Sequence, residues 1–150
     1  MKTIIAILFA VLFASTASAD DDPRQAIAAT LKTMFERPEK PLDITPVVVQ
    51  ADWAIAGWRQ DGRGGRVLMK KTHHGWSAYL CSGDSLREAG TLEKLGLPAN
   101  DAARLAAGLK EAEASLDSSA LALFSSFEGT VMLMDEASKG AGGGHEGHAP

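Results

Sequence analysis

The sequence predicts an α+β fold: an N-terminal helix, an antiparallel β-meander of three to four strands, two to three further helices and a possible final strand. Three observations support this prediction. Apolar residues recur at helical spacing after Pro23, residues 47–81 are rich in β-branched and aromatic side chains broken by glycine turns, and helical spacing returns after residue 84. We place a single domain at residues 20–136, between a signal peptide at 1–19 and a Gly/His-rich tail at 137–150, which we expect to be flexible.

The first 19 residues, MKTIIAILFAVLFASTASA, are typical of a secretory signal peptide. Lys2 precedes an apolar run from Ile4 to Ala14, and the segment ends in the small-x-small pattern Ala17-Ser18-Ala19. The apolar run is too short to span a bilayer. We therefore expect a secreted protein in a bacterial periplasm, whose mature chain begins near Asp20 and does not insert into a membrane.

The charge balance is acidic, with 15 Lys and Arg against 19 Asp and Glu and a formal net charge of −4. An acidic surface without a basic stripe argues against nucleic acid and anionic lipid as partners. No hydrolase, kinase or dinucleotide motif is present, and the Gly-rich segment at 62–65 lacks the Lys-Ser/Thr of a phosphate loop. We therefore expect a protein that is not an enzyme.

The first helix is predicted to begin at Asp22 and Pro23, because an acidic cap followed by proline at the first helical position favours a helix start. Pro38 ends the helix near Arg37, since proline disfavours helical geometry in the residue before it. An extended connector with three prolines follows over residues 38–46. The apolar face consists of Ile27, Leu31, Met34 and Phe35.

The β-rich block begins at Val47 and ends at Cys81. DGRGG at 61–65 and HHG at 73–75 are predicted turns, and we interpret His73 and His74 as exposed turn residues. Strict alternation in the last strand places one set of side chains on one face, namely Trp76, Ala78 and Leu80, and Tyr79 and Cys81 on the other. The tryptophans at 53, 58 and 76 are expected to pack across neighbouring strands or under the first helix.

The last third of the domain is predicted to be mainly helical. One helix follows Asp84 or Ser85, either of which can cap it, and stops at Gly96. A second begins at Asn100, and its apolar side consists of Leu105, Leu109, Ala112 and Leu116. Residues 119–129 favour a further helix, and TVMLMD at 130–135 is predicted to form a final strand that rejoins the sheet.

The tail KGAGGGHEGHAP, residues 139–150, carries His145 and His148 at H-x-x-H spacing. In a flexible segment, imidazoles three residues apart can close onto one ion, and imidazole suits Cu(II), Zn and Ni. The alternative is a disordered tail whose histidines bind no physiological metal.

Met132, Met134 and Cys81 are further candidate ligands. On a strand, Met132 and Met134 would share a face, and thioethers favour Cu(I). The alternative is core packing, which the apolar neighbours favour. Cys81 has no partner for an intramolecular disulfide, and it precedes a predicted helix start, where the helix dipole lowers a thiol pKa. The alternative for Cys81 is a packed or half-buried thiol, with metal ligation second.

The stretch from Asp52 to Leu86 resembles the small secreted bacterial proteins called copper uptake system-associated proteins. The matching pattern is Asp52-Trp53-Ala54, Gly57-Trp58, Gly64-Gly65-Arg66, Gly75-Trp76, Cys81-x-Gly83-Asp84 and Leu86. The resemblance covers about a third of the mature chain and implies a role associated with copper transport. It carries over no catalytic or ligand residue.

The sequence therefore predicts a periplasmic accessory protein in copper uptake or delivery. It would bind copper through His145 and His148, with Met132, Met134 and Cys81 as further candidates, or dock on a copper transporter or chaperone. Two other functions stay open. Solvent-facing tryptophans would favour a metal-free protein-interaction module. A deep apolar pocket with convergent polar groups would favour a small-ligand carrier or enzyme with a cone-like α+β fold.

Overall fold

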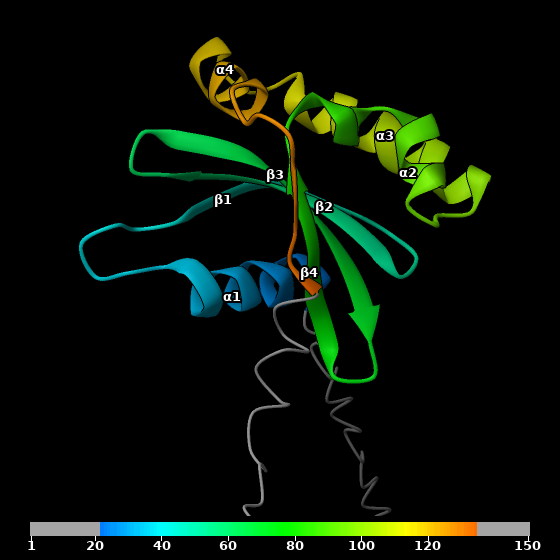
Figure 1. Cartoon of the computed structure of the whole chain (residues 1–150), viewed down its shortest axis with the longest axis horizontal. Helices are drawn as coiled ribbons and strands as arrows, with labels where there is room; N and C mark the ends of the chain where they lie inside the picture. Colours follow the sequence, from blue (N-terminus) through cyan, green and yellow to red (C-terminus); the bar gives the residue numbers. More distant parts are fainter. Residues whose placement is uncertain (1–21, 135–150) are drawn as a thin grey trace, which may run out of the picture.

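Five antiparallel strands form one sheet in the order β1-β2-β3-β4-β5, and helices cover both of its faces (Figure 1). The computed structural model describes residues 22–134. Its elements are α1 Pro23–Phe35, β1 Asp43–Gln50, β2 Trp53–Gln60, β3 Arg63–Thr72, β4 Gly75–Ser82, the 3₁₀ helix η1 Asp84–Arg87, α2 Ala89–Lys94, α3 Ala99–Glu113, α4 Ser118–Ser125 and β5 Thr130–Met132. The predicted α+β class and its order of elements are confirmed.

Helix α1 begins as its sequence predicts. The Asp22 side chain accepts a hydrogen bond from the backbone N–H of Arg24, and Pro23 occupies the first helical turn. The helix ends at Phe35, and the Glu36 carboxylate then accepts a hydrogen bond of 3.0 Å from the backbone N–H of Leu42. The following connector is therefore short and fixed at both ends.

Strand β1 begins earlier than the three prolines of the connector suggest, because Pro46 lies inside it. The pairing of β1 with β2 shifts register between Ile44 and Val47, and β1 is an edge strand. Proline is tolerated at such an irregularity, since its missing N–H removes no regular bond of the ladder.

Both predicted hairpins are present, but the first turn is shorter than predicted, because residues 63–65 already belong to β3. Asp61 and Gly62, both at positive φ, join β2 to β3, and His73 and His74 join β3 to β4. Two consecutive residues at positive φ are typical of the two-residue hairpin loop, whose twist matches that of the strands. His73 and His74 are exposed, as expected for turn residues.

Strand β4 departs from strict alternation. Its pairing with β3 shifts register, so that Tyr79 is left without a partner residue on β3. Ala78 and Cys81 consequently face α1, whereas Tyr79 and Leu80 pack into the core on the opposite face. The prediction that Trp76, Ala78 and Leu80 share one face was wrong because one extra residue reverses the alternation.

The sheet separates two apolar cores. The core beneath η1, α2 and α3 consists of Trp53, Ile55, Leu68, Leu80, Leu86, Leu92, Leu97, Ala102, Leu105 and Leu109. The core beneath α1 consists of Ile27, Leu31, Leu42, Ala54, Ala56, Val67, Met69 and Ala78. The second core is thus built on smaller side chains, three of its five sheet residues being alanine.

The last third of the domain, which is mainly helical, differs in detail from what the sequence predicts. The single helix expected after Asp84 is divided at Glu88, whose backbone is extended, into η1 and α2. Helix α3 has Pro98 rather than Asn100 at its N-cap, and it ends before Leu116. Helix α4 and the short strand β5 confirm the two last predicted elements. Within residues 22–134, no helix has the length and apolar character needed to cross a bilayer.

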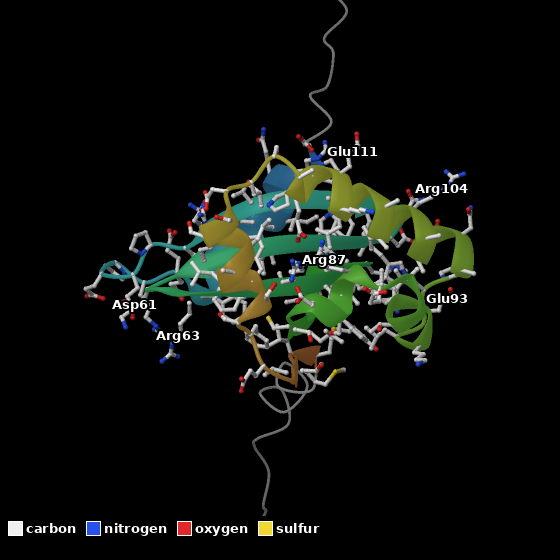
Figure 2. The ribbon with its side chains drawn as sticks, turned by 90° about the horizontal axis from the view of Figure 1, so that it is seen from above. Asp61, Arg63, Arg87, Glu93, Arg104 and Glu111 are labelled. Carbon is white, nitrogen blue, oxygen red and sulfur yellow. The ribbon has the colours of Figure 1, made fainter. Side chains whose placement is uncertain are left out.

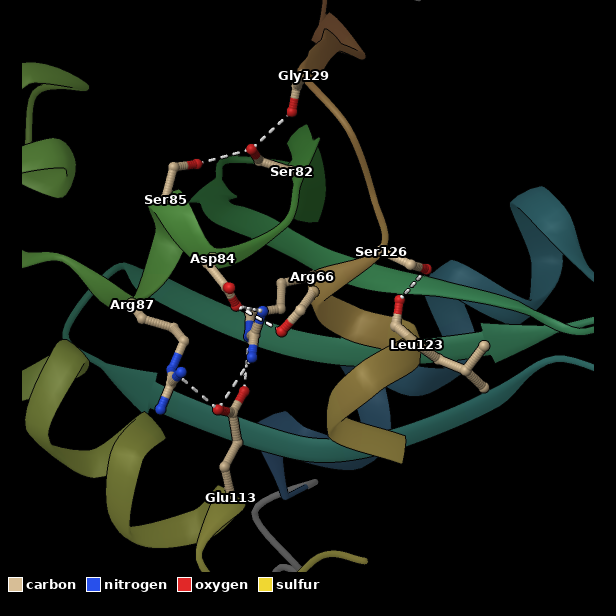
Figure 3. A network of polar contacts seen from close by, with 10 residues as sticks. Arg66, Ser82, Asp84, Ser85, Arg87, Glu113, Leu123, Ser126 and Gly129 are labelled. Carbon is tan, nitrogen blue, oxygen red and sulfur yellow. Dashed lines mark hydrogen bonds and ion pairs between the residues drawn. The ribbon is translucent and has the colours of Figure 1, made fainter. Parts of the chain in front are cut away.

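A buried ion pair connects the helices to the sheet (Figure 3). Arg66 of β3 is 0% exposed, and its guanidinium donates two hydrogen bonds to Glu113 of α3, at 2.6 and 3.0 Å, and one to Asp84 of η1, at 3.1 Å. Arg87 also contacts the Glu113 carboxylate, and the Arg66 guanidinium lies over the ring of Phe124 in α4. Removing one partner of such a buried pair costs proteins roughly 3–5 kcal/mol, so the pair holds three helical elements in place.

Most of the charged residues labelled in Figure 2 lie at the periphery of the molecule. Figure 2 shows Glu93, Arg104 and Glu111 pointing outward from α2 and α3, and Asp61 and Arg63 at the tip of the β2–β3 hairpin. Arg87 lies centrally instead, because it reaches toward Glu113.

Candidate functional site

A cavity of about 250 Å³ lies between α1 and the sheet. Seven of its ten lining residues are pure hydrocarbon side chains, and three carry a polar atom. The lining consists of Leu31 and Phe35 from α1, Leu42, Ile44 from β1, Trp58 and Gln60 from β2, Val67 from β3, Cys81 from β4, Phe127 and Val131 from β5. All five strands therefore contribute to one apolar space beneath a single helix.

One wall of the cavity is an aromatic pair. The rings of Trp58 and Phe127 meet edge to face, with centroids 5.9 Å apart and an interplanar angle of 83°. Gly65, opposite Trp58 on β3, makes room for both rings, since a Cβ atom there would lie 3.0 Å from Phe127 and 3.1 Å from Trp58. The absent side chain at Gly65 therefore sets the shape of this wall.

Gln60 closes a second side of the cavity. Its side-chain Nε2 donates to the backbone carbonyl oxygens of Phe35, at 3.0 Å, and of Lys40, at 2.8 Å. Both amide protons are therefore used, and they tie the end of α1 and its connector to β2. The amide N–H groups of Gln60 are not available to a ligand.

The indole Nε1 of Trp58 differs from the side-chain amide of Gln60. This nitrogen is buried, and it has no hydrogen-bond partner among residues 22–134. Burying an indole N–H without a partner is unfavourable, and tryptophans in protein interiors usually find an acceptor.

Cys81 faces the cavity from β4, and its side chain is half-buried. Burial raises the pKa of the thiol from 9.0 to about 11, because the apolar surroundings disfavour the thiolate. The expectation of a lowered pKa was wrong, since desolvation outweighs any effect of the short 3₁₀ helix that follows. The half-buried side chain agrees with the alternative of a packed or half-buried thiol, and Cys81 stays protonated at neutral pH.

The other candidate ligands do not converge on Cys81. Met132 lies opposite Leu80 in the β4–β5 pairing, whereas Val131 lies opposite Cys81, so Met132 and Cys81 are on different faces. Met134 lies beyond the end of β5. The prediction that Met132 and Met134 share one face of a strand therefore does not hold. In the part of the chain that the structure describes, no three His, Cys, Asp or Glu side chains gather to hold a metal ion.

His145 and His148 lie outside the described residues. Their role as copper ligands, like that of Met132, Met134 and Cys81, stays a prediction.

The three tryptophan side chains pack against other residues rather than lying exposed on the surface. Trp53 is only 7% exposed and lies between Tyr79 and the ammonium group of Lys70, while Trp58 and Trp76 are half-buried against the α1-side core. The prediction that they pack across strands or under the first helix is confirmed. The exposed large apolar side chains of residues 22–134 are instead Met34, Val131 and Met132.

Sequence reasoning missed this cavity because its ten residues are scattered from position 31 to position 131. The one local signal was the tryptophan at 58 followed by paired glycines at 64 and 65, which we read as strand and turn. Comparison with family models, curated proteins and solved structures finds no match to this chain.

The raised pKa of Cys81 has a measurable consequence. We expect iodoacetamide to alkylate the folded protein slowly at pH 8, with a rate that rises toward pH 11 as the thiolate forms. Mass spectrometry of the protein over this pH range measures the rate. The urea-unfolded protein is the control and should show its rise near pH 9. A folded thiol that reacts at pH 8 as fast as the unfolded one would show that the cavity does not shield Cys81.

Proposed function

We propose that the protein binds a small apolar molecule in the cavity beneath α1, as a carrier rather than an enzyme. The cavity itself is the observation that supports this proposal. Its lining is almost entirely hydrocarbon, and its ten side chains come from elements far apart in the sequence. Apolar pockets with a small number of placed polar groups are the usual form of small-molecule sites.

The size of the cavity indicates the size of the ligand. An engineered apolar cavity of roughly 150 Å³ takes up benzene, so a space of about 250 Å³ suits a larger ring system such as naphthalene. A molecule that binds the folded chain and not the unfolded one stabilises the folded state. Filling the space would therefore stabilise the fold.

Val131 marks where the cavity reaches the surface. It lines the cavity and is nevertheless 49% exposed, because β5 is a three-residue edge strand. Besides the pairing of β5 with β4, hydrogen bonds hold the chain on both sides of the strand. The Ser82 hydroxyl donates to the Gly129 carbonyl at 2.8 Å, and the Leu133 N–H donates to the Tyr79 carbonyl at 3.0 Å (Figure 3 shows the first). A ligand would enter beside Val131.

A pair of substitutions on β5 tests this proposal. Val131→Trp should weaken the binding of naphthalene about tenfold, which corresponds to ~1.4 kcal/mol, because the larger side chain occupies the entrance. Met132→Trp is the matched control, since Met132 is similarly exposed but faces away from the cavity. Calorimetric titration of both variants and the unchanged protein measures the affinities. Equal affinities for all three proteins, or no binding to any, would contradict the proposal.

Copper handling is a second candidate function, and the spacing of His145 and His148 in the glycine-rich tail favours it. The resemblance to copper uptake system-associated proteins also supports it. On this hypothesis the protein resides in the periplasm and delivers copper to a transporter or chaperone. The tail and the cavity use different residues, so the two proposals are independent of each other.

Truncation of the tail tests the copper hypothesis. The mature protein should bind Cu(II) more tightly than a version that ends at Lys139, because the truncated chain lacks both imidazoles. Titration of both forms with Cu(II), and with Cu(I) under reducing conditions, measures the difference. If both forms bind copper equally weakly, the tail is not a copper site.

A further inference from the structure

We propose that one Cu(II) ion is held jointly by imidazoles from two parts of the chain: the β3–β4 turn, with His73 and His74, and the tail, with His145 and His148. This inference rests on the copper hypothesis, the second function proposed above, and goes beyond it by assigning ligands from the folded domain. The chain has four histidines, and all of them lie in these two segments. Imidazole suits Cu(II), which nitrogen ligands bind more tightly than the other divalent first-row ions.

The turn carries its two imidazoles on a hydrogen-bonded backbone. The Thr72 hydroxyl accepts a hydrogen bond from the backbone N–H of His74 at 3.2 Å and donates to the carbonyl oxygen of Gly75 at 3.0 Å. His73 and His74 are both exposed, so an ion in solution can reach them. Within residues 22–134, no three potential ligands gather around one point. The pair in the turn therefore needs ligands from outside this part of the chain to complete a site.

The described chain ends beside the strand that starts at this turn. Met132 of β5 lies opposite Leu80 of β4, and the Leu133 N–H donates to the Tyr79 carbonyl at 3.0 Å. Because β5 is antiparallel to β4, the chain runs along β4 toward the β3–β4 turn as it reaches residue 134 (Figure 1). The tail therefore continues from the edge of the sheet that leads to His73 and His74.

The tail is long enough to reach the turn. Tyr79 and His74 are five residues apart in the sequence, which corresponds to roughly 17 Å along a strand. Leu133 and His145 are twelve residues apart, and twelve residues can span up to about 40 Å. His145 and His148 can thus return to the turn without a fully extended chain.

The charges favour the same arrangement. The first two residues after the described structure are acidic, Asp135 and Glu136. Lys71 precedes the turn, is exposed, and lies opposite Trp76 in the β3–β4 pairing. Carboxylates next to Lys71 would offset the repulsion between its ammonium group and a metal ion at the turn.

Sharing one ion also explains how two modest pairs of ligands can make one good site. Two imidazoles leave other coordination positions of Cu(II) to water, whereas four imidazoles can fill the tetragonal set that this ion prefers. Once the tail has bound the ion, the turn binds it within the same molecule, and such linked binding exceeds the affinity of either part alone.

Four proteins test the inference: the unchanged mature protein, a double variant with His73→Asn and His74→Asn, the form that ends at Lys139, and the control Asp61→Asn. Asparagine is common in turns, so the double variant should keep the hairpin. The control removes an exposed carboxylate from the β2–β3 turn, at the other end of β3. Calorimetric titration with Cu(II) gives the affinity and the number of ions per chain.

We expect the unchanged protein to bind one Cu(II) per chain, and the double variant to bind it about tenfold more weakly or worse, because only the tail ligands remain. Asp61→Asn should bind like the unchanged protein, and the form that ends at Lys139 should bind weakly. A second readout leaves the turn intact. Cu(II) is paramagnetic, so one equivalent should broaden the backbone N–H signals of Thr72 and Gly75 in nuclear magnetic resonance spectra of the unchanged protein, and much less in the truncated form.

The opposite results separate this inference from the copper hypothesis. If truncation weakens binding but the double variant binds like the unchanged protein, the turn takes no part and the inference is overturned, while the copper hypothesis stands. Two ions per chain, one lost with each pair of histidines, would overturn it as well, because the pairs would then act separately. If the unchanged protein binds no Cu(II), or the truncated form binds it equally well, both fail. If the double variant does not fold, the broadening of the turn signals decides alone.

Discussion

The structure depends on a mismatch between one helix and one sheet. Helix α1 has 13 residues, a length of about 20 Å, and an α-helix with its side chains is roughly 10–12 Å across. Five strands spaced about 4.8 Å apart form a surface roughly 19 Å wide between the outermost strand axes. A single helix therefore cannot cover the whole face. The sheet curls around it, so that α1 contacts both β1 and β4 (Figure 1), and the uncovered apolar space at the end of the helix is the cavity.

On the opposite face of the sheet, α4 packs closely against β2 and β3. Glycines allow α4 to approach closely, since a Cβ atom at Gly57 would lie 2.7 Å from the ring of Phe124 and one at Gly64 would lie 3.0 Å from Leu123. The buried pair of Arg66 and Glu113 then fixes α3 against β3. Because this face is tightly held, the strands have little freedom to collapse into the space on the other face. One rigid face thus helps to keep the second face open.

Local features of the sequence predicted the elements well, and features that depend on distant contacts were predicted poorly. The Asp22-Pro23 start of α1 and the Asp61-Gly62 turn follow from the conformational preferences of the residues themselves. The face of Leu80 was mispredicted because the register shift at Tyr79 arises from pairing between strands. The pKa of Cys81 was expected to be lowered from its position in the sequence, but burial decides its direction, and burial depends on α1 and β5. The cavity escaped prediction for the same reason.

The central claim is that the space beneath α1 is an apolar site able to take up a small molecule. Xenon tests it most directly, because this atom enters apolar cavities without needing a polar contact. A crystal of the protein held under xenon pressure should show an ordered xenon atom in contact with Leu31, Trp58 and Val67. A diffraction map with no xenon there, and with the surrounding side chains closed over the space, would contradict the account.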